Sequence, residues 1–170
     1  NIFWVFHVLR DYAHTIAAAK HRHVPDIPRW MEEVERLEKA QVPLPIIFGH
    51  HDLLPTNFMD DGKRIWLIDW EYGGFGTAMF DLANIASNNQ FTEQAEKDLL
   101  TRYFERAPDQ ALLRSFYAMK TASALREAVW GMVSEINLNA PGVDYVAYAR
   151  EYLGRYENML ADFNSKFGKT

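Results

Sequence analysis

The sequence predicts a mainly helical α+β protein in which a small β-hairpin core carries loops and is surrounded by helices. Apolar residues recur at helical spacing through most of the chain, and one hairpin signal stands near its middle. The length of 170 residues is enough for one hydrophobic core and too short for two. Residues 1–170 are therefore expected to form a single domain.

Two helices are expected before the β core. Apolar and aromatic residues from Ile2 to about Arg22 have the spacing of an amphipathic helix, and a more charged helix is expected from Arg29 to Ala40. The glutamate-rich run of the second helix is interpreted as a solvated face with i, i+4 ion pairs. Histidines at seven-residue intervals are interpreted as solvated side chains rather than metal ligands: His7, His14 and His21.

The β core begins with a short apolar run, Ile46 to Phe48, and continues with a hairpin. Two apolar segments, Phe58-Met59 and Ile65 to Ile68, flank an Asp-Gly pair of the kind that two-strand turns prefer. We therefore expect these segments to pair as antiparallel strands.

A glycine-rich segment and four further helices complete the chain. Glu71 to Thr77 is expected to be a loop, and its Gly73-Gly74-x-Gly76 to be a flexible turn, because it does not open the helix of a βαβ unit. Helical spacing then returns, with breaks at proline and glycine. The expected helices cover residues 80–88, 92–106, 110 to about 136, and 145 to about 163.

The composition excludes several classes of protein. A formal charge of −5 argues against a nucleic-acid partner, which would require a basic face. The absence of cysteine excludes disulfides and thiolate metal sites, and it is compatible with a reducing compartment. The apolar run from Ile2 to Leu9 is too short to span a bilayer and lacks the flanks of a signal peptide. We therefore expect no membrane insertion and a cytoplasmic location.

Chemically informative residues lie on both sides of the predicted hairpin. Asn57 ends the loop before the first strand, and Asp69 follows the second strand, so strand pairing would bring both to the same open end. Asp52, in the same loop as Asn57, completes a set of oxygen-bearing side chains. Mg²⁺ prefers such oxygens, and phosphoryl transfer requires metal ligands together with a group that orients the attacking hydroxyl.

Two segments carry a family resemblance. His50-x-Asp52-Leu53-x-x-x-Asn57 fits the catalytic-loop pattern of kinases, and Ile68-Asp69-Trp70-Glu71-Tyr72 resembles a segment of choline and ethanolamine kinases. The chain thus resembles, nearly end to end, the protein-kinase-like C-terminal lobe of that family. The resemblance implies an ATP-dependent phosphotransferase that uses Mg²⁺ and phosphorylates the hydroxyl of choline or a similar amino alcohol. It also implies a place in phospholipid metabolism.

The resemblance implies a role for each matching residue. Asp52 would be the catalytic base, and His50 would brace the catalytic loop. Asn57 and Asp69 would hold the metal ion on the phosphates of ATP. Asp81 resembles the family's aspartate that supports the same loop from the start of a helix.

The acceptor pocket is expected to be aromatic. Residues 127–132 resemble the Trp-Gly helix that lines the choline pocket of the family, and residues 144–149 resemble its Tyr-x-x-Tyr-Ala helix start. Aromatic faces bind a quaternary ammonium group by cation–π attraction. Val133 and Asn88 depart from the tryptophan and the acidic residue of the eukaryotic enzymes, so ethanolamine or another amino alcohol stays open. The implied cage consists of Tyr72, Trp130, Tyr145 and Tyr148.

Other features set the alternatives. Leu54 stands where protein kinases carry a lysine, which favours a small-molecule substrate, and His51 is assigned no role. No glycine-rich phosphate loop or strand lysine precedes Asp52, so the N-terminal nucleotide lobe is expected to be absent and the chain alone to be inactive. An aminoglycoside or sugar kinase and a non-catalytic pseudokinase fragment both stay open as alternatives.

Overall fold

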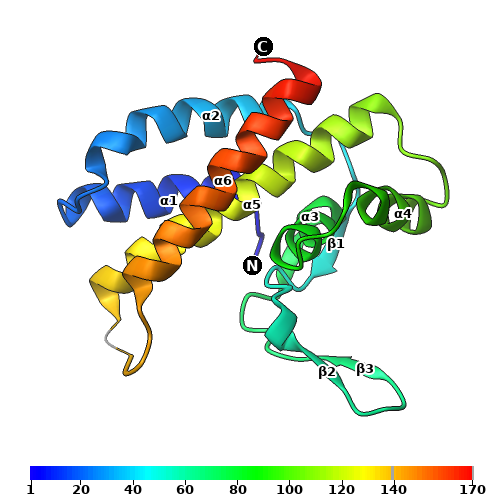
Figure 1. Cartoon of the computed structure of the whole chain (residues 1–170), viewed down its shortest axis with the longest axis horizontal. Coiled ribbons are helices and arrows are strands. Elements are labelled where there is room, and N and C mark those ends of the chain that lie inside the picture. Colours follow the sequence, from blue (N-terminus) through cyan, green and yellow to red (C-terminus); the bar gives the residue numbers. More distant parts are fainter. Residues whose placement is uncertain (139, 170) are drawn as a thin grey trace.

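A computed structural model of the chain describes residues 1–138 and 140–169. The described residues form a mainly helical α+β fold around two small sheets, which confirms the predicted fold class (Figure 1). The helices lie within a few residues of their predicted bounds. They are α1 (Val5–Ala18), α2 (Ile27–Lys39), α3 (Ala78–Asn88), α4 (Glu93–Phe104), α5 (Gln110–Asn137) and α6 (Tyr145–Phe167), with short 3-10 helices η1 (Val24–Asp26) and η2 (Pro55–Asn57).

Helix α5 is the centre of the hydrophobic core. It contacts α1, α2, α3 and α6, and α6 runs back along it (Figure 1). Small and apolar residues lie on nearly every side of α5, and side chains such as Phe116, Leu125 and Met132 are fully buried. A helix that is apolar on all sides belongs in the interior of a domain, which explains its central place.

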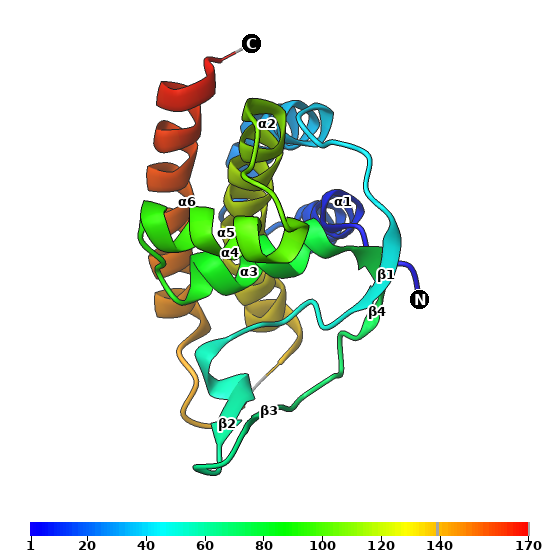
Figure 2. The same ribbon diagram turned by 90° about the vertical axis from the view of Figure 1, so that its right-hand side faces the viewer.

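The predicted hairpin is confirmed. Strands β2 (Phe58–Asp60) and β3 (Ile65–Leu67) pair antiparallel, and the glycine at the tip of the turn has a φ of 78°. The pairing continues past the strands, because the N–H of Ile68 donates to the carbonyl of Asn57 at 3.0 Å. Figure 2 shows the hairpin extending away from the helices. Asn57 and the residue after Ile68, Asp69, therefore lie at the open end, beside the helical core.

The prediction that Glu71 to Thr77 is a loop is wrong for its second half. Gly74–Thr77 is strand β4, which pairs antiparallel with β1 (Ile46–Gly49). The glycines of this strand are not a flexible turn, since they allow other backbone to approach closely. A Cβ atom on Gly76 would lie 2.9 Å from the carbonyl oxygen of Phe3 and 3.0 Å from Nε2 of His51.

The first residues of the chain are extended rather than helical. Ile2 forms a β-bridge with Phe75, and the N–H of Phe3 donates to the carbonyl of Phe75 at 2.8 Å. The expected helix from Ile2 therefore begins later, at Val5. The backbone hydrogen bonds offered by β4 outcompete the helical tendency of these residues.

Replacing Gly76 by alanine is expected to destabilise the protein by about 1–3 kcal/mol, because the added methyl group would overlap the Phe3 carbonyl and the His51 ring. Thermal unfolding followed by circular dichroism measures this change. A matched control is Gly154→Ala on α6, where nothing lies within 4 Å of the added Cβ. Alanine there is expected to raise stability by up to about 1 kcal/mol. Equal effects at both positions would contradict the packing role of Gly76.

Candidate active site

The catalytic loop (residues 50–57) is attached to helix α3, whose side chains accept hydrogen bonds from the loop backbone. The Asp81 carboxylate accepts the N–H groups of His50 and His51, at 2.7 and 2.8 Å. One turn further along α3, Asn84 Oδ1 accepts the N–H of Leu53 at 2.6 Å. Asp81 thus contacts the loop in the way that the family resemblance implies, and Asn84 is a second support that the sequence did not reveal.

His50 joins the catalytic loop to the end of the hairpin. Its Nε2 lies 2.8 Å from the carbonyl oxygen of Ile68, and its Nδ1 lies 3.2 Å from the backbone nitrogen of Asp52. A carbonyl oxygen can only accept, so Nε2 carries the proton and Nδ1 accepts the Asp52 N–H. His50 is buried and also packs edge-on against Trp70. This geometry suits a brace rather than a proton donor.

Asp52 and Asp69 border one cavity of about 190 Å³. Asn57 is joined to Asp52, because its Nδ2 donates to the Asp52 carbonyl oxygen at 2.8 Å and to Oδ2 at 3.3 Å. Asp69 has a φ of 62°, an uncommon conformation for a residue other than glycine, which concentrates at functional sites. The structure therefore brings the three predicted oxygen-bearing residues together at the open end of the hairpin.

The side chains of Asn57 and Asp69 fit a magnesium ion. Asn57 uses its amide nitrogen to contact Asp52, which leaves its amide oxygen as a potential ligand. The Asp69 carboxylate has no hydrogen bond or ion pair within the described residues, although it borders the cavity. In the same part of the chain, no group of three or more His, Cys, Asp or Glu side chains could hold a metal ion. Mg²⁺ bound against phosphates needs fewer, since one or two carboxylates suffice.

Three of the four predicted cage residues line the same cavity. Tyr72, Trp130 and Tyr148 form its aromatic side, together with the carboxylates of Glu71 and Glu127. Trp130 Nε1 donates to the Tyr72 hydroxyl at 3.2 Å, and the Trp130 and Tyr148 rings meet edge to face at 5.4 Å.

Tyr145, the fourth predicted cage residue, does not border the cavity in this structure. Its ring contacts the edge of Trp130, with the two ring centres 6.1 Å apart. It therefore supports the aromatic side from behind.

Arg126 is a site residue that sequence reasoning missed. Its side chain is 2% exposed on α5, and its Nη1 lies 2.6 Å from Glu127 Oε1 and 3.3 Å from Asp52 Oδ1. Burial raises the pKa of the Asp52 carboxyl, and the positive charge of Arg126 offsets part of that increase. The available signal was an adjacent Arg-Glu pair inside an otherwise apolar and small-residue helix.

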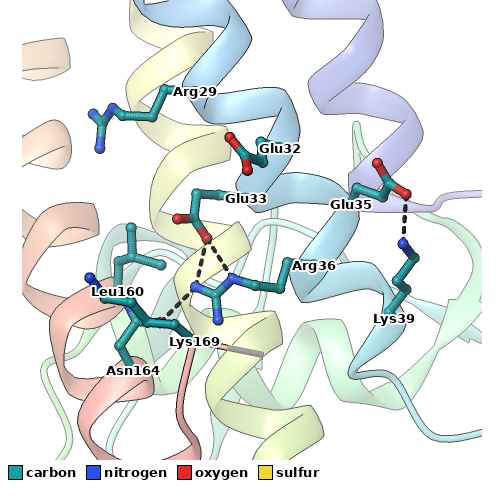
Figure 3. A pocket seen from close by; sticks show the side chains of 9 residues that line it. All are labelled: Arg29, Glu32, Glu33, Glu35, Arg36, Lys39, Leu160, Asn164 and Lys169. Carbon is teal, nitrogen blue, oxygen red and sulfur yellow. Dashed lines mark hydrogen bonds and ion pairs between the residues drawn. The ribbon is translucent and has the colours of Figure 1, made fainter.

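A larger cavity, of about 620 Å³, lies between α2 and the end of α6, away from these residues (Figure 3). Its charged side chains are paired among themselves: Arg36 contacts Glu33 and Asn164, and Lys39 contacts Glu35 at 2.7 Å. The Glu35–Lys39 pair is exposed and confirms the expected i, i+4 pairing on this helix face. No aromatic side chain lines this cavity. The candidate active site is therefore the smaller cavity beside Asp52.

Two of the histidines near the N-terminus are engaged by carboxylates. His21 lies 3.2 Å from Glu135, and His23 lies 2.8 Å from Asp26. Each of these imidazoles contacts a different acid, so the contacts are ordinary ion pairs or hydrogen bonds and do not converge on a shared site.

Sequence comparison identifies the family. The chain matches the choline/ethanolamine kinase family model over residues 3–100. It is 28% identical over 108 residues to protein LicA of Haemophilus influenzae, an alignment that covers 61% of this chain and 39% of LicA. It is 35% identical over 80 residues to thiamine kinase of Shigella boydii, which covers 46% of this chain and 28% of that kinase.

Two solved structures share the fold. A choline/ethanolamine kinase family protein from Mesorhizobium loti superimposes with a TM-score of 0.78 at 25% identity, covering 99% of this chain and 58% of that one. A structure of LicA in complex with AMP superimposes with a TM-score of 0.74 at 24% identity, covering 98% of this chain and 55% of that one.

The chain therefore belongs to the choline/ethanolamine kinase family, since the family model matches more than half of it. This confirms the resemblance inferred from the two motifs around the hairpin, and the fold is that of the kinase-like superfamily. The chain spans 39% of the curated relative LicA and 58% of the Mesorhizobium loti protein. Within its described residues, no helix combines the length and apolar character needed to cross a bilayer.

His51, which was assigned no role, is fully buried beneath the catalytic loop. Its ring stacks on Phe3 with the ring centres 4.1 Å apart, and its Nδ1 lies 3.2 Å from the carbonyl oxygen of Tyr72. Nδ1 must donate to this carbonyl, so Nε2 is unprotonated, and it has no hydrogen-bond partner among the described residues. Burial lowers the pKa of His51 below its ordinary value of 6.5.

The lowered pKa of His51 predicts a loss of stability in acid. The unfolded chain protonates this imidazole more readily than the folded chain does, so its contribution is fully present above pH 6.5. It is lost as the pH falls toward the lower folded pKa, by at most about 1.4 kcal/mol per pH unit. Urea unfolding at several pH values measures this slope. His51→Asn, which tolerates the positive φ, is expected to give a shallower slope below pH 6.5. An unchanged slope would contradict a neutral buried His51.

Proposed function

We propose that this chain is the catalytic C-terminal lobe of a kinase that transfers phosphate from ATP to the hydroxyl group of choline or a similar amino alcohol. The observation that carries the proposal is a single cavity with two functions on its walls. Asp52 and Asp69 border it on one side, and Tyr72, Trp130 and Tyr148 border it on the other. A catalytic carboxylate and a cation-binding aromatic surface thus face the same small space.

Asp52 is the proposed catalytic base. The acceptor hydroxyl would hydrogen-bond to its carboxylate, which orients the oxygen toward the γ-phosphorus of ATP and receives the hydroxyl proton. The new bond forms between the hydroxyl oxygen and phosphorus while the bond to the β–γ bridging oxygen breaks, and ADP leaves. Asn57 and Asp69 would hold Mg²⁺, which neutralises the charge of the phosphates when bound.

The aromatic side of the cavity would receive the ammonium head of the acceptor. A cation against an aromatic face gains about 0.5–2 kcal/mol per contact, and a quaternary ammonium has no N–H to donate. Glu71 and Glu127 add negative charge to the same wall. These features suit a compact organic cation, and the relatives named for choline, ethanolamine and thiamine are consistent with that class.

The size of the cavity favours an amino alcohol over an aminoglycoside. Sites for drug-sized ligands measure about 300–1,000 Å³, whereas this cavity measures about 190 Å³. The several rings of an aminoglycoside would not fit without displacing Trp130 or Tyr148. The alternative of an aminoglycoside or sugar kinase is therefore less well supported than the amino-alcohol kinase.

The parent protein is proposed to contain a further lobe that grips the nucleotide phosphates. Apolar side chains are exposed on the outer face of the β1–β4 sheet, among them Phe48 at 56% and Phe75 at 51%. Exposed apolar surface of this kind marks a contact with another body. The position of this face, next to the catalytic loop, suits a lobe that closes over ATP.

Replacing Asp52 by asparagine in the parent kinase should lower kcat by about 10²–10⁴-fold, because the general base is lost while the shape is kept. The activity is measured as phosphate transfer to choline, ethanolamine, thiamine and kanamycin. Asp98→Asn, at an exposed position on α4, is the matched control and should leave kcat unchanged. Unchanged turnover for Asp52→Asn would support the pseudokinase alternative, and transfer to kanamycin alone would favour the aminoglycoside alternative.

The isolated 170-residue chain is expected to bind Mg-ATP weakly or not at all, because a glycine-rich phosphate loop and its lysine are absent from its sequence. Isothermal titration calorimetry measures this affinity directly. Tight binding by the isolated chain would contradict the proposal that nucleotide binding requires a further lobe.

A further inference from the structure

A buried ionic chain, made of Tyr148, Glu127, Arg126 and Asp52, connects the aromatic wall of the cavity to the proposed base. The Tyr148 hydroxyl donates to Glu127 Oε2 at 2.8 Å. Arg126 Nη1 donates to Glu127 Oε1 at 2.6 Å and to Asp52 Oδ1 at 3.3 Å. All four residues border the cavity, and they come from three separate parts of the chain: the catalytic loop, α5 and α6.

The Asp52 carboxylate is held at both of its oxygens. Arg126 contacts Oδ1, and Asn57 Nδ2 contacts Oδ2 at 3.3 Å. The Asp52 backbone is fixed as well, since its N–H donates to His50 and its carbonyl accepts from Asn57. A carboxylate restrained in this way can present a lone pair in one direction only, which is what alignment with an acceptor hydroxyl requires.

We propose that Arg126 is a positioning residue that orients the Asp52 carboxylate and keeps it ionised, and that Glu127 limits how tightly Arg126 binds it. The inference rests on the proposed function, in which Asp52 accepts the proton of the substrate hydroxyl. It adds a residue that neither the two kinase motifs nor the family resemblance assigns.

The unequal distances within the ionic chain are the basis of this role. The guanidinium lies much closer to Glu127 than to Asp52, at 2.6 against 3.3 Å. A guanidinium bound tightly to Asp52 would make that carboxylate a poor base, whereas no cation at all would leave a buried carboxyl inclined to stay protonated. The longer contact lies between these limits. Glu127, which is itself fixed by Tyr148, draws Arg126 away from Asp52.

A purely stabilising role for Arg126 is a poorer explanation. Its side chain is 2% exposed, and its Nε has no hydrogen-bond partner among the described residues. Buried ion groups with an unpaired donor contribute little to stability compared with apolar side chains of the same size. The guanidinium also lies over the Tyr72 ring, 4.8 Å from its centre, and so borders the space where the substrate cation would bind.

Other charged and titratable groups face Asp52 from the elements packed around it. Their effects are present in every variant and cancel when variants are compared. They are Tyr12 on α1, His50 in the catalytic loop, Asp69, Glu71 and Tyr72 after β3, and Tyr148 on α6, besides Arg126 and Glu127 on α5.

The test is an NMR titration of the Asp52 carboxyl carbon in this chain, with the signal assigned by its loss in Asp52→Asn. Arg126→Met removes the cation and should move the titration midpoint to higher pH. Glu127→Gln releases Arg126 toward Asp52 and should move the midpoint to lower pH. Arg126→Lys keeps the charge, so its midpoint should stay closer to that of the unmodified chain than the midpoint of Arg126→Met does.

Shifts in opposite directions for Arg126→Met and Glu127→Gln would support the proposal. Unchanged midpoints, or shifts in the same direction, would overturn it. Should Arg126→Met fail to fold, the Glu127→Gln titration decides alone, because an unmoved or raised midpoint there contradicts the inferred competition for Arg126.

Kinetics in the parent kinase separate this inference from the proposed function. Arg126→Met should lower kcat by about 10²-fold, with a smaller change in KM for the amino alcohol, and should move the acid limb of the kcat profile to higher pH. Arg126→Lys should restore part of kcat. If Asp52→Asn abolishes turnover while Arg126→Met changes neither kcat nor the acid limb, the function stands and the role of Arg126 falls. If the unmodified kinase transfers no phosphate, the function falls, and the titration still decides the coupling.

Discussion

The position of the catalytic loop depends on the carboxylate of Asp81. Its two oxygens accept the consecutive N–H groups of His50 and His51, which is geometrically feasible because His51 adopts a positive φ. Hydrogen bonds to a charged acceptor contribute about 1.5–3 kcal/mol each, so these two fix the loop firmly to α3. Even the residue before the loop is constrained, since a Cβ on Gly49 would lie 2.8 Å from Asp81 Oδ2. The helical core thereby determines where Asp52 stands.

A second constraint comes from burying several charges in one place. Asp52, Arg126 and Glu127 are all largely shielded from solvent, and removing one member of such a buried group typically costs about 3–5 kcal/mol because a partner is left uncompensated. Each charge is tolerable only while the others are present. Helix α5 therefore contributes in two ways, as the centre of the hydrophobic core and as the source of the cation that faces the proposed base.

The sequence was sufficient to predict most helices, the hairpin and the family, because these depend on local patterns. The Asp-Gly turn forecast the β2–β3 pairing, and the spacing from His50 to Asn57 marked the loop. Strand β4 was missed because its glycines resemble a loop, although tertiary contacts with Phe3 and His51 require them. Arg126 was missed because its partners, Asp52 and Tyr148 through Glu127, are distant in sequence. Contacts made by folding carry no local signal.

The central claim is that side chains from the catalytic loop and from the end of the hairpin meet around one divalent cation. Anomalous diffraction from crystals of the parent kinase with Mn²⁺ and a non-hydrolysable ATP analogue tests it most directly. The expected result is a manganese peak about 2.1 Å from side-chain oxygens of Asn57 and Asp69, with Asp52 facing the acceptor site. A peak at other ligands, with Asn57 and Asp69 turned away from the phosphates, would contradict the account.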